Sequence, residues 1–89
     1  MPGWEIIACG RVQGVGFRWL VQACALRLGV NGYVKNQQDG TVLILATGNT
    51  EALTQFAETI KQGNSHAQVR QLIINELTHY KEYEDFFIA

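Results

Sequence analysis

Apolar residues recur along the first third of the chain with two different spacings. A short apolar run from about Trp4 to Cys9 predicts a β-strand. The segment from about Phe17 to Leu28 repeats its apolar residues with the period of an α-helix, and Gly29 follows as a residue suited to the left-handed conformation that ends many helices. The stripe that should face a core consists of Phe17, Val21, Cys24 and Leu28.

The rest of the chain contains four more strand patterns and one helix pattern. The expected strands run from about Asn31 to Gln37, Thr41 to Thr47, Gln68 to Leu77 and Glu84 to Ile88. Asp39 and Gly40 form a strong hairpin signal between the first two of these. Asn49 or Thr50 can cap a second helix, whose apolar face consists of Leu53, Phe56, Ala57 and Ile60.

The order of these elements predicts the fold class. It reads βαββαβ followed by a short C-terminal strand. Two right-handed βαβ units joined by a hairpin give an α+β, ferredoxin-like fold, with one antiparallel sheet and both helices on one of its faces. We expect residues 1–89 to form a single domain, since this length leaves no room for a second core.

Composition excludes two classes of partner. The chain has 7 basic and 8 acidic residues, a net charge of −1, and no basic tail. The expected central strand over 41–47 carries no aromatic or charged residue, so we expect no nucleic-acid surface. No apolar run approaches the ~18 residues of a membrane span, and no leader pattern is visible. We therefore expect a cytoplasmic protein with no membrane partner.

The two cysteines, Cys9 and Cys24, have neither the spacing nor the neighbouring histidines of a zinc site. Two free thiols and a disulfide between them both remain open, although a cytoplasmic setting favours the thiols. His66 and His79 both lie in the second half of the chain, far in sequence from the glycines between residues 10 and 16, and we expect both on the surface. The sequence predicts no metal and no cofactor.

The segment Gly10–Arg18 is the strongest candidate for a binding site. It follows a predicted strand and leads into a helix, so glycines can take positive φ there while free N–H groups point at an anion. Arg18 falls in the first helical turn, where its guanidinium can reach the same anion. The segment is not a Walker A loop, because no Gly-Lys-Ser/Thr follows, and its glycine spacing does not fit the dinucleotide fingerprint.

Three stretches together resemble the acylphosphatase family, namely Gly10–Arg18, Leu28–Asn36 and Asp39–Val42. The resemblance extends from about Glu5 to Ile88. It implies the same ferredoxin-like fold and metal-independent hydrolysis of the carboxyl–phosphate bond of acyl phosphates. A binding module for acyl or carbamoyl phosphate without efficient turnover is the alternative.

The resemblance also implies the roles of individual residues. Arg18 would bind phosphate and Asn36 would orient the attacking water. The phosphate-binding loop would consist of Gln13, Gly14, Val15, Gly16 and Phe17, acting through their backbone N–H groups. Arg11 matches a position that is often basic in the family, and we expect it on the surface with a weak attraction for anions.

A site this sparse suits an acyl phosphate. The chain has no plausible Ser-His-Asp or Cys-His constellation, so catalysis must depend on positioning and electrostatics. Hydrolysis of an acyl phosphate expels a carboxylate, and the pKa of the corresponding acid is roughly 4–5, so this group leaves without a proton donor. The remaining tasks are to hold the phosphoryl oxygens and to aim a water molecule.

The outward side of the first predicted helix is unusually apolar, with Trp19, Ala23 and Leu26 in line. One interpretation is an exposed tryptophan on a monomer, which we expect. The alternative is weak self-association through these three residues.

Overall fold

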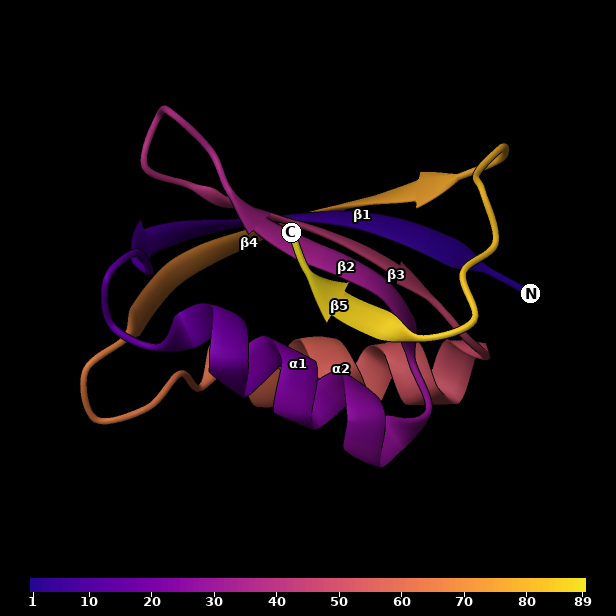
Figure 1. The fold of residues 1–89 in the computed structure, drawn as a ribbon, viewed down its shortest axis with the longest axis horizontal. Helices are drawn as coiled ribbons and strands as arrows, with labels where there is room; N and C mark the ends of the chain where they lie inside the picture. The colour runs from indigo at the N-terminus through magenta and orange to yellow at the C-terminus, as the bar shows by residue number, and fades with distance from the viewer.

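The computed structural model describes all residues, 1–89, and contains every element that the sequence predicts. In chain order the elements are β1 (Gly3–Arg11), α1 (Phe17–Leu28), β2 (Asn31–Asn36), β3 (Val42–Thr47), α2 (Thr50–Lys61), β4 (Gln68–Leu77) and β5 (Phe86–Ile88). The largest differences from expectation are in the first and last strands: β1 ends two residues later than predicted, and β5 begins two residues later. Figure 1 shows the sheet above the two helices.

The five strands form one sheet in the order β4-β1-β3-β2-β5. The apolar strand β3 is central, as its composition predicts, and β1, β2, β3 and β4 pair antiparallel. The expectation of a wholly antiparallel sheet needs correction at one edge, because β5 pairs parallel with β2 through Gly32↔Phe86 and Val34↔Ile88. The sheet is therefore mixed.

The path of the chain explains this parallel pair. β4 ends beside the start of β1, at the end of the molecule where β2 also starts. Residues 78–85 then cross that end to the opposite edge of the sheet (Figure 1, right). β5 enters from the same end as β2 and must run in the same direction.

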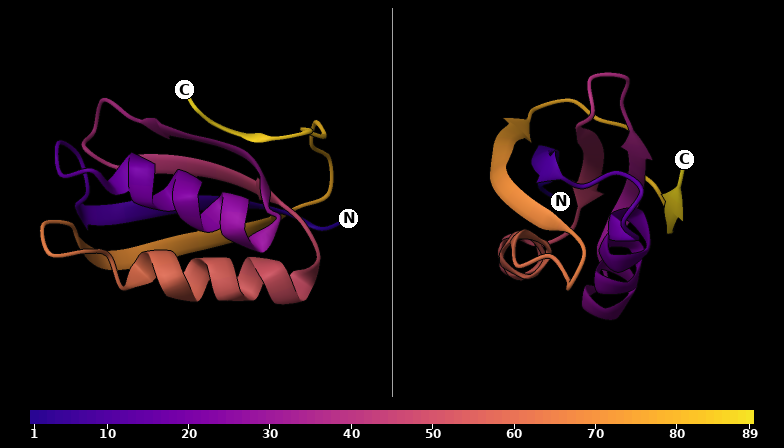
Figure 2. Two further views of the ribbon diagram at one scale, coloured as in Figure 1. Left: turned by 60° about the horizontal axis from the view of Figure 1, so that its bottom comes forward. Right: turned by 90° about the vertical axis from the view of Figure 1, so that its left-hand side faces the viewer.

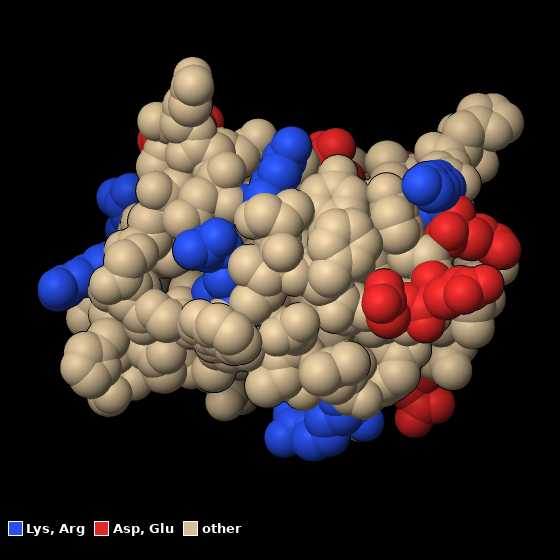
Figure 3. Space-filling model, viewed as in Figure 1, with Lys and Arg blue, Asp and Glu red and all other residues tan.

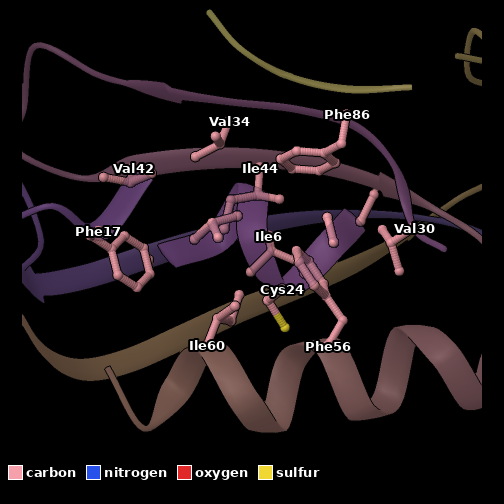
Figure 4. Close-up of a cluster of buried hydrophobic side chains, with 14 of the residues drawn as sticks. Ile6, Phe17, Cys24, Val30, Val34, Val42, Ile44, Phe56, Ile60 and Phe86 are labelled. Atoms are coloured by element: carbon pink, nitrogen blue, oxygen red, sulfur yellow. The ribbon is translucent and has the colours of Figure 1, made fainter. Parts of the chain in front are cut away.

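Both helices cover one face of the sheet and contact each other, as the two views in Figure 2 show. Between the helices and the sheet lies one core of 17 buried residues, part of which is drawn in Figure 4. The predicted inward face of α1 is confirmed: Phe17, Val21 and Cys24 are buried, and Leu28 is half-buried against the core. All four predicted residues of α2 are buried as well: Leu53, Phe56, Ala57 and Ile60.

Both cysteines are free thiols. Cys24 is buried in the core, and this burial raises the pKa of its thiol, so the thiolate is disfavoured at neutral pH. Cys9 is half-buried on β1. Neither helix has the length and apolar character needed to cross a bilayer.

The pairing of the strands also defines two ends of the sheet. β1 finishes, β2 finishes and α1 begins at one end (left in Figure 1), so the β1–α1 loop and the β2–β3 hairpin lie there. We call it the loop end, and the other end the distal end. The fold thus brings the glycine loop and Asn36, which are distant in sequence, to the same end.

Candidate active site

The loop between β1 and α1 has the backbone conformation that its glycines predict. Gly14 and Gly16 adopt left-handed conformations, with φ of 72° and 79°. A Cβ added to either residue would meet nothing within 4 Å. Glycine is therefore favoured here by its φ angle and not by packing, and the open space beside the backbone is available to a ligand.

The N-terminus of α1 is uncapped. The N–H of Leu20 donates to the carbonyl of Gly16 at 3.1 Å, no side chain caps the helix, and its first turn holds no acidic residue. By contrast, α2 is capped by Asn49, whose Oδ1 accepts from the N–H of Ala52 at 2.7 Å, and Glu51 lies in its first turn. The first N–H groups of α1 and the positive end of its dipole are thus free to meet an anion.

A hollow of about 250 Å³ lies at this helix terminus. It is lined by Val12, Gly14, Gly16, Phe17, Arg18 and Trp19. Arg18 is half-buried, and its Nη1 donates to the backbone oxygen of Ala89 at 3.5 Å, the outer limit for a hydrogen bond. A guanidinium has five N–H donors, so most of them remain available for oxygen atoms of a ligand.

The contact with Ala89 relates Arg18 to Asn36. The N–H of Ala89 donates to the carbonyl of Val34 at 2.8 Å, and Asn36 follows two residues later, about 7 Å along β2. Since alternate residues of a strand share a face, Asn36 lies on the helix-covered face, as the buried Val34 does. Asn36 is exposed because it extends past the core at the loop end. Arg18 and Asn36 therefore both lie at the loop end, on the side of the sheet that the helices cover, although they line different hollows.

The Gln13 side chain has a role that sequence reasoning did not find. Its Nε2 donates to the carbonyls of Gln37 at 2.8 Å and of Thr41 at 2.9 Å. Both amide hydrogens are therefore used within the protein, and the backbone N–H is the donor of Gln13 that remains for an anion. The side chain ties the glycine loop to the hairpin that directly follows Asn36.

The hairpin is itself braced by polar contacts. Gln37 Nε2 donates to Thr41 Oγ1 at 3.0 Å, and Thr41 Oγ1 donates to Asp39 Oδ1 at 2.6 Å. The backbone N–H of Thr41 donates to the same carboxylate at 3.0 Å. The two hydrogen bonds from Thr41, first that of its side chain and then that of its backbone, lower the pKa of Asp39 below its ordinary value. The hairpin is thus a defined support for the end of β2.

We expect Gln13→Ala to loosen this connection. Two hydrogen bonds would be lost, each contributing about 0.5–1.5 kcal/mol, so the free energy of unfolding in urea should fall by about 1–3 kcal/mol. The kcat should also fall, because the loop would no longer be fixed relative to Asn36. The exposed neighbour Gln38 provides the control: Gln38→Ala should change neither quantity. Equal effects of the two substitutions would contradict this assignment.

Charged side chains are segregated between the two ends of the sheet. The loop end holds five basic and two acidic residues, Arg11, Arg18, Lys35, Lys61, Arg70, Asp39 and Glu58. The distal end holds two basic and six acidic residues, Arg27, Lys81, Glu5, Glu51, Glu76, Glu82, Glu84 and Asp85. Figure 3 shows most of the visible acidic side chains gathered at the right, away from the loop end. The net charge of −1 is the sum of about +3 at the loop end and −4 at the distal end.

This asymmetry predicts that anion binding depends on salt. At 0.01 M ionic strength the Debye length is about 30 Å, and at 1 M it is about 3 Å, so the field at the loop is strong only in dilute salt. We expect the Kd of inorganic phosphate, measured by calorimetry, to rise about five- to tenfold over this range. Arg70→Gln should weaken the dependence, while Arg27→Gln at the distal end should not. A Kd that is unchanged by salt would contradict the prediction.

Neither histidine belongs to the site. His66 lies in an exposed loop between α2 and β4, where its Nδ1 bonds to Ser65 Oγ at 2.9 Å, and His79 is exposed after β4. No group of three or more His, Cys, Asp and Glu side chains comes together to hold a metal ion. The loop end therefore offers backbone N–H groups and a guanidinium around one hollow, while the amide of Asn36 lines a separate hollow at the same end.

The fold is that of a ferredoxin-like α+β protein with a hollow at a strand–loop–helix junction, and the comparisons with known proteins specify the class further. The family model described as Acylphosphatase matches residues 4–88. An acylphosphatase of Bacillus velezensis is 48% identical over 89 residues, covering 100% of this chain and 99% of the relative.

Solved structures agree. The crystal structure of acylphosphatase from Bacillus subtilis aligns with a TM-score of 0.96 at 40% identity, covering 100% of this chain and 99% of the other. Full-length HypF, in a phosphate- and nucleotide-bound form, aligns with a TM-score of 0.86 at 28% identity, covering 99% of this chain and 12% of HypF. The chain belongs to the acylphosphatase family of hydrolases.

Proposed function

We propose that this chain carries out the acylphosphatase reaction with Arg18 holding the phosphoryl oxygens and Asn36 orienting the attacking water. The observation that carries this proposal is the uncapped start of α1, which opens onto a hollow lined by Arg18, at the end of the sheet where β2 finishes with Asn36. Backbone N–H groups of Gln13, Gly14, Val15, Gly16 and Phe17 complete the phosphate-binding loop. None of the backbone hydrogen bonds outside the helices and strands uses an N–H of residues 13–17 as donor.

The reaction needs no further group. Water attacks phosphorus, the bond between phosphorus and the acyl oxygen breaks, and the electron pair leaves with the carboxylate. The water protons end on phosphate and solvent. The phosphoryl group passes through a loose transition state with charge on its peripheral oxygens, which the N–H groups and the guanidinium stabilise. The amide oxygen of Asn36 accepts a hydrogen bond from the water and so fixes its direction of attack.

A binding module without efficient turnover is the competing function. The chain is 40% identical to the Bacillus subtilis acylphosphatase structure but 28% identical to HypF, and the TM-scores are 0.96 and 0.86. This difference favours the hydrolase.

An assay with benzoyl phosphate tests the choice directly. We expect release of benzoate and phosphate in equal amounts, unaffected by chelators, and competitive inhibition by inorganic phosphate. Calorimetry with phosphate alone provides the second measurement. Phosphate binding without turnover would establish the module, and the absence of both binding and turnover would overturn the proposed site.

We further propose a single-domain, cytoplasmic monomer acting on small acyl phosphates. One continuous core supports the single domain, and two free thiols support the cytoplasmic location. Weak self-association through Trp19, Ala23 and Leu26 is the alternative to a monomer. Sedimentation over a range of concentrations should give the mass of one chain throughout, and a rising mass would favour self-association.

A further inference from the structure

Trp19 is the large side chain of α1 whose position the proposed chemistry leaves unexplained. Its side chain is 70% exposed, although tryptophan has a large apolar surface whose contact with water is unfavourable. The opposite face of the helix is buried, so Trp19 contributes nothing to the core there. Its exposure needs a reason other than the fold.

The location of Trp19 supplies one. It follows Arg18 directly, in the first turn of α1, and lines the same hollow as Arg18 and the two left-handed glycines. Leu26, which is 62% exposed, lies seven residues further on, about 10 Å along the helix, and does not line the hollow. The two exposed apolar side chains of this helix therefore differ in their relation to the anion pocket.

The composition of the hollow indicates what it can bind. One part of its lining is polar, consisting of the glycine backbone and the guanidinium of Arg18. The other part is apolar, and of its members Val12 and Phe17 are both 1% exposed, so the indole ring offers most of the accessible apolar surface. A ligand with an anionic head joined to an apolar, planar body matches both parts.

We propose that Trp19 is a specificity-determining residue that packs against the acyl group of the substrate, so that acyl phosphates with an aromatic acyl group are preferred to those with a small one. This inference rests on the proposed function, because the phosphate must occupy the loop for its acyl group to reach the indole. Burial of an aromatic ring against another, together with the area it removes from water, is sufficient for a preference of about tenfold.

The kinetic test compares benzoyl phosphate with acetyl phosphate. The readout is the ratio of their kcat/KM values, which is independent of enzyme concentration and of any common loss of activity. We expect Trp19→Ala to lower the ratio about tenfold, mainly through the KM for benzoyl phosphate. Leu26→Ala, on the same helix and similarly exposed, should leave the ratio unchanged.

An equilibrium measurement separates this inference from the proposed function. Phenyl phosphate and inorganic phosphate serve as probes, with indole fluorescence followed in the Trp4→Phe variant, where Trp19 is the remaining tryptophan. We expect phenyl phosphate to bind about tenfold more tightly and to change the fluorescence, and Trp19→Ala to abolish the difference in affinity, measured by calorimetry. If neither acyl phosphate is hydrolysed but this difference is seen, the proposed reaction fails and the role of Trp19 stands. An unchanged affinity difference in Trp19→Ala, or an equal loss in Leu26→Ala, overturns the inference.

Discussion

Arg18→Ala should lower kcat/KM for an acyl phosphate by at least 10²–10³, the largest effect expected of any single substitution in this chain. Removing one hydrogen-bond donor from a pocket that stabilises developing charge already costs that much, about 3–4 kcal/mol of transition-state stabilisation. Arg18 contributes a full positive charge in addition to several N–H donors, and it lines the hollow at the start of α1. Steady-state kinetics with benzoyl phosphate measure the loss, and the affinity for inorganic phosphate should fall as well.

Arg18→Lys distinguishes charge from geometry. A lysine keeps the positive charge but cannot bond two phosphoryl oxygens side by side as a guanidinium does. We therefore expect little recovery of activity relative to Arg18→Ala. Arg27→Ala is the matched control, because Arg27 is exposed in the last turn of the same helix, at the distal end. If lysine restored full activity, or if Arg27→Ala had a comparable effect, the proposed role of Arg18 would be wrong.

These substitutions should affect catalysis far more than stability. The hydrogen bond from Arg18 to Ala89 is long, and exposed contacts of this kind contribute little. Thermal unfolding of Arg18→Ala should therefore lie within a few degrees of the parent protein. This separation between rate and stability is typical of a residue that serves a ligand.

Most of the fold could be predicted from local signals. The positive φ of Gly14, Gly16 and Gly29, the cap at Asn49 and the turn at Asp39–Gly40 each depend on residues close in sequence, and the structure confirms them. The inward faces of both helices follow from periodicity alone. The direction of β5 could not be predicted in this way, because it depends on which edge of the sheet the chain reaches after β4.

The candidate site also contains some features that local sequence predicts and others that it does not. The loop and its arginine are contiguous, so their arrangement follows from a strand, two glycines and a helix start. The contacts of Gln13 with residues 37 and 41 depend instead on where the hairpin lies in three dimensions, and no local pattern contains that information. The same is true of the charge segregation, since acidic residues far apart in the sequence, such as Glu5, Glu51 and Glu76, come to one end only when the chain is folded and the strands are paired.

Asn36→Ala should lower kcat by about 10²-fold and leave the affinity for inorganic phosphate within about twofold of the parent. The reason is that the amide is proposed to act on the water and not on the phosphoryl oxygens, and a poorly directed nucleophile costs a rate factor of this order. Asn36 is exposed at the last position of β2, so its replacement removes no core contact. Turnover is measured with benzoyl phosphate, and affinity by competitive inhibition with phosphate.

Two further variants sharpen this prediction. Gln38→Ala changes an exposed amide lining the same surface hollow as Asn36 and should leave both kcat and phosphate affinity unchanged. Asn36→Asp keeps an oxygen that can accept from water but adds a negative charge beside the anion, so it should weaken phosphate binding while retaining more turnover than Asn36→Ala at saturating substrate. A loss of phosphate affinity in Asn36→Ala with kcat preserved would place Asn36 among the phosphate-binding groups and would leave the water without an orienting residue.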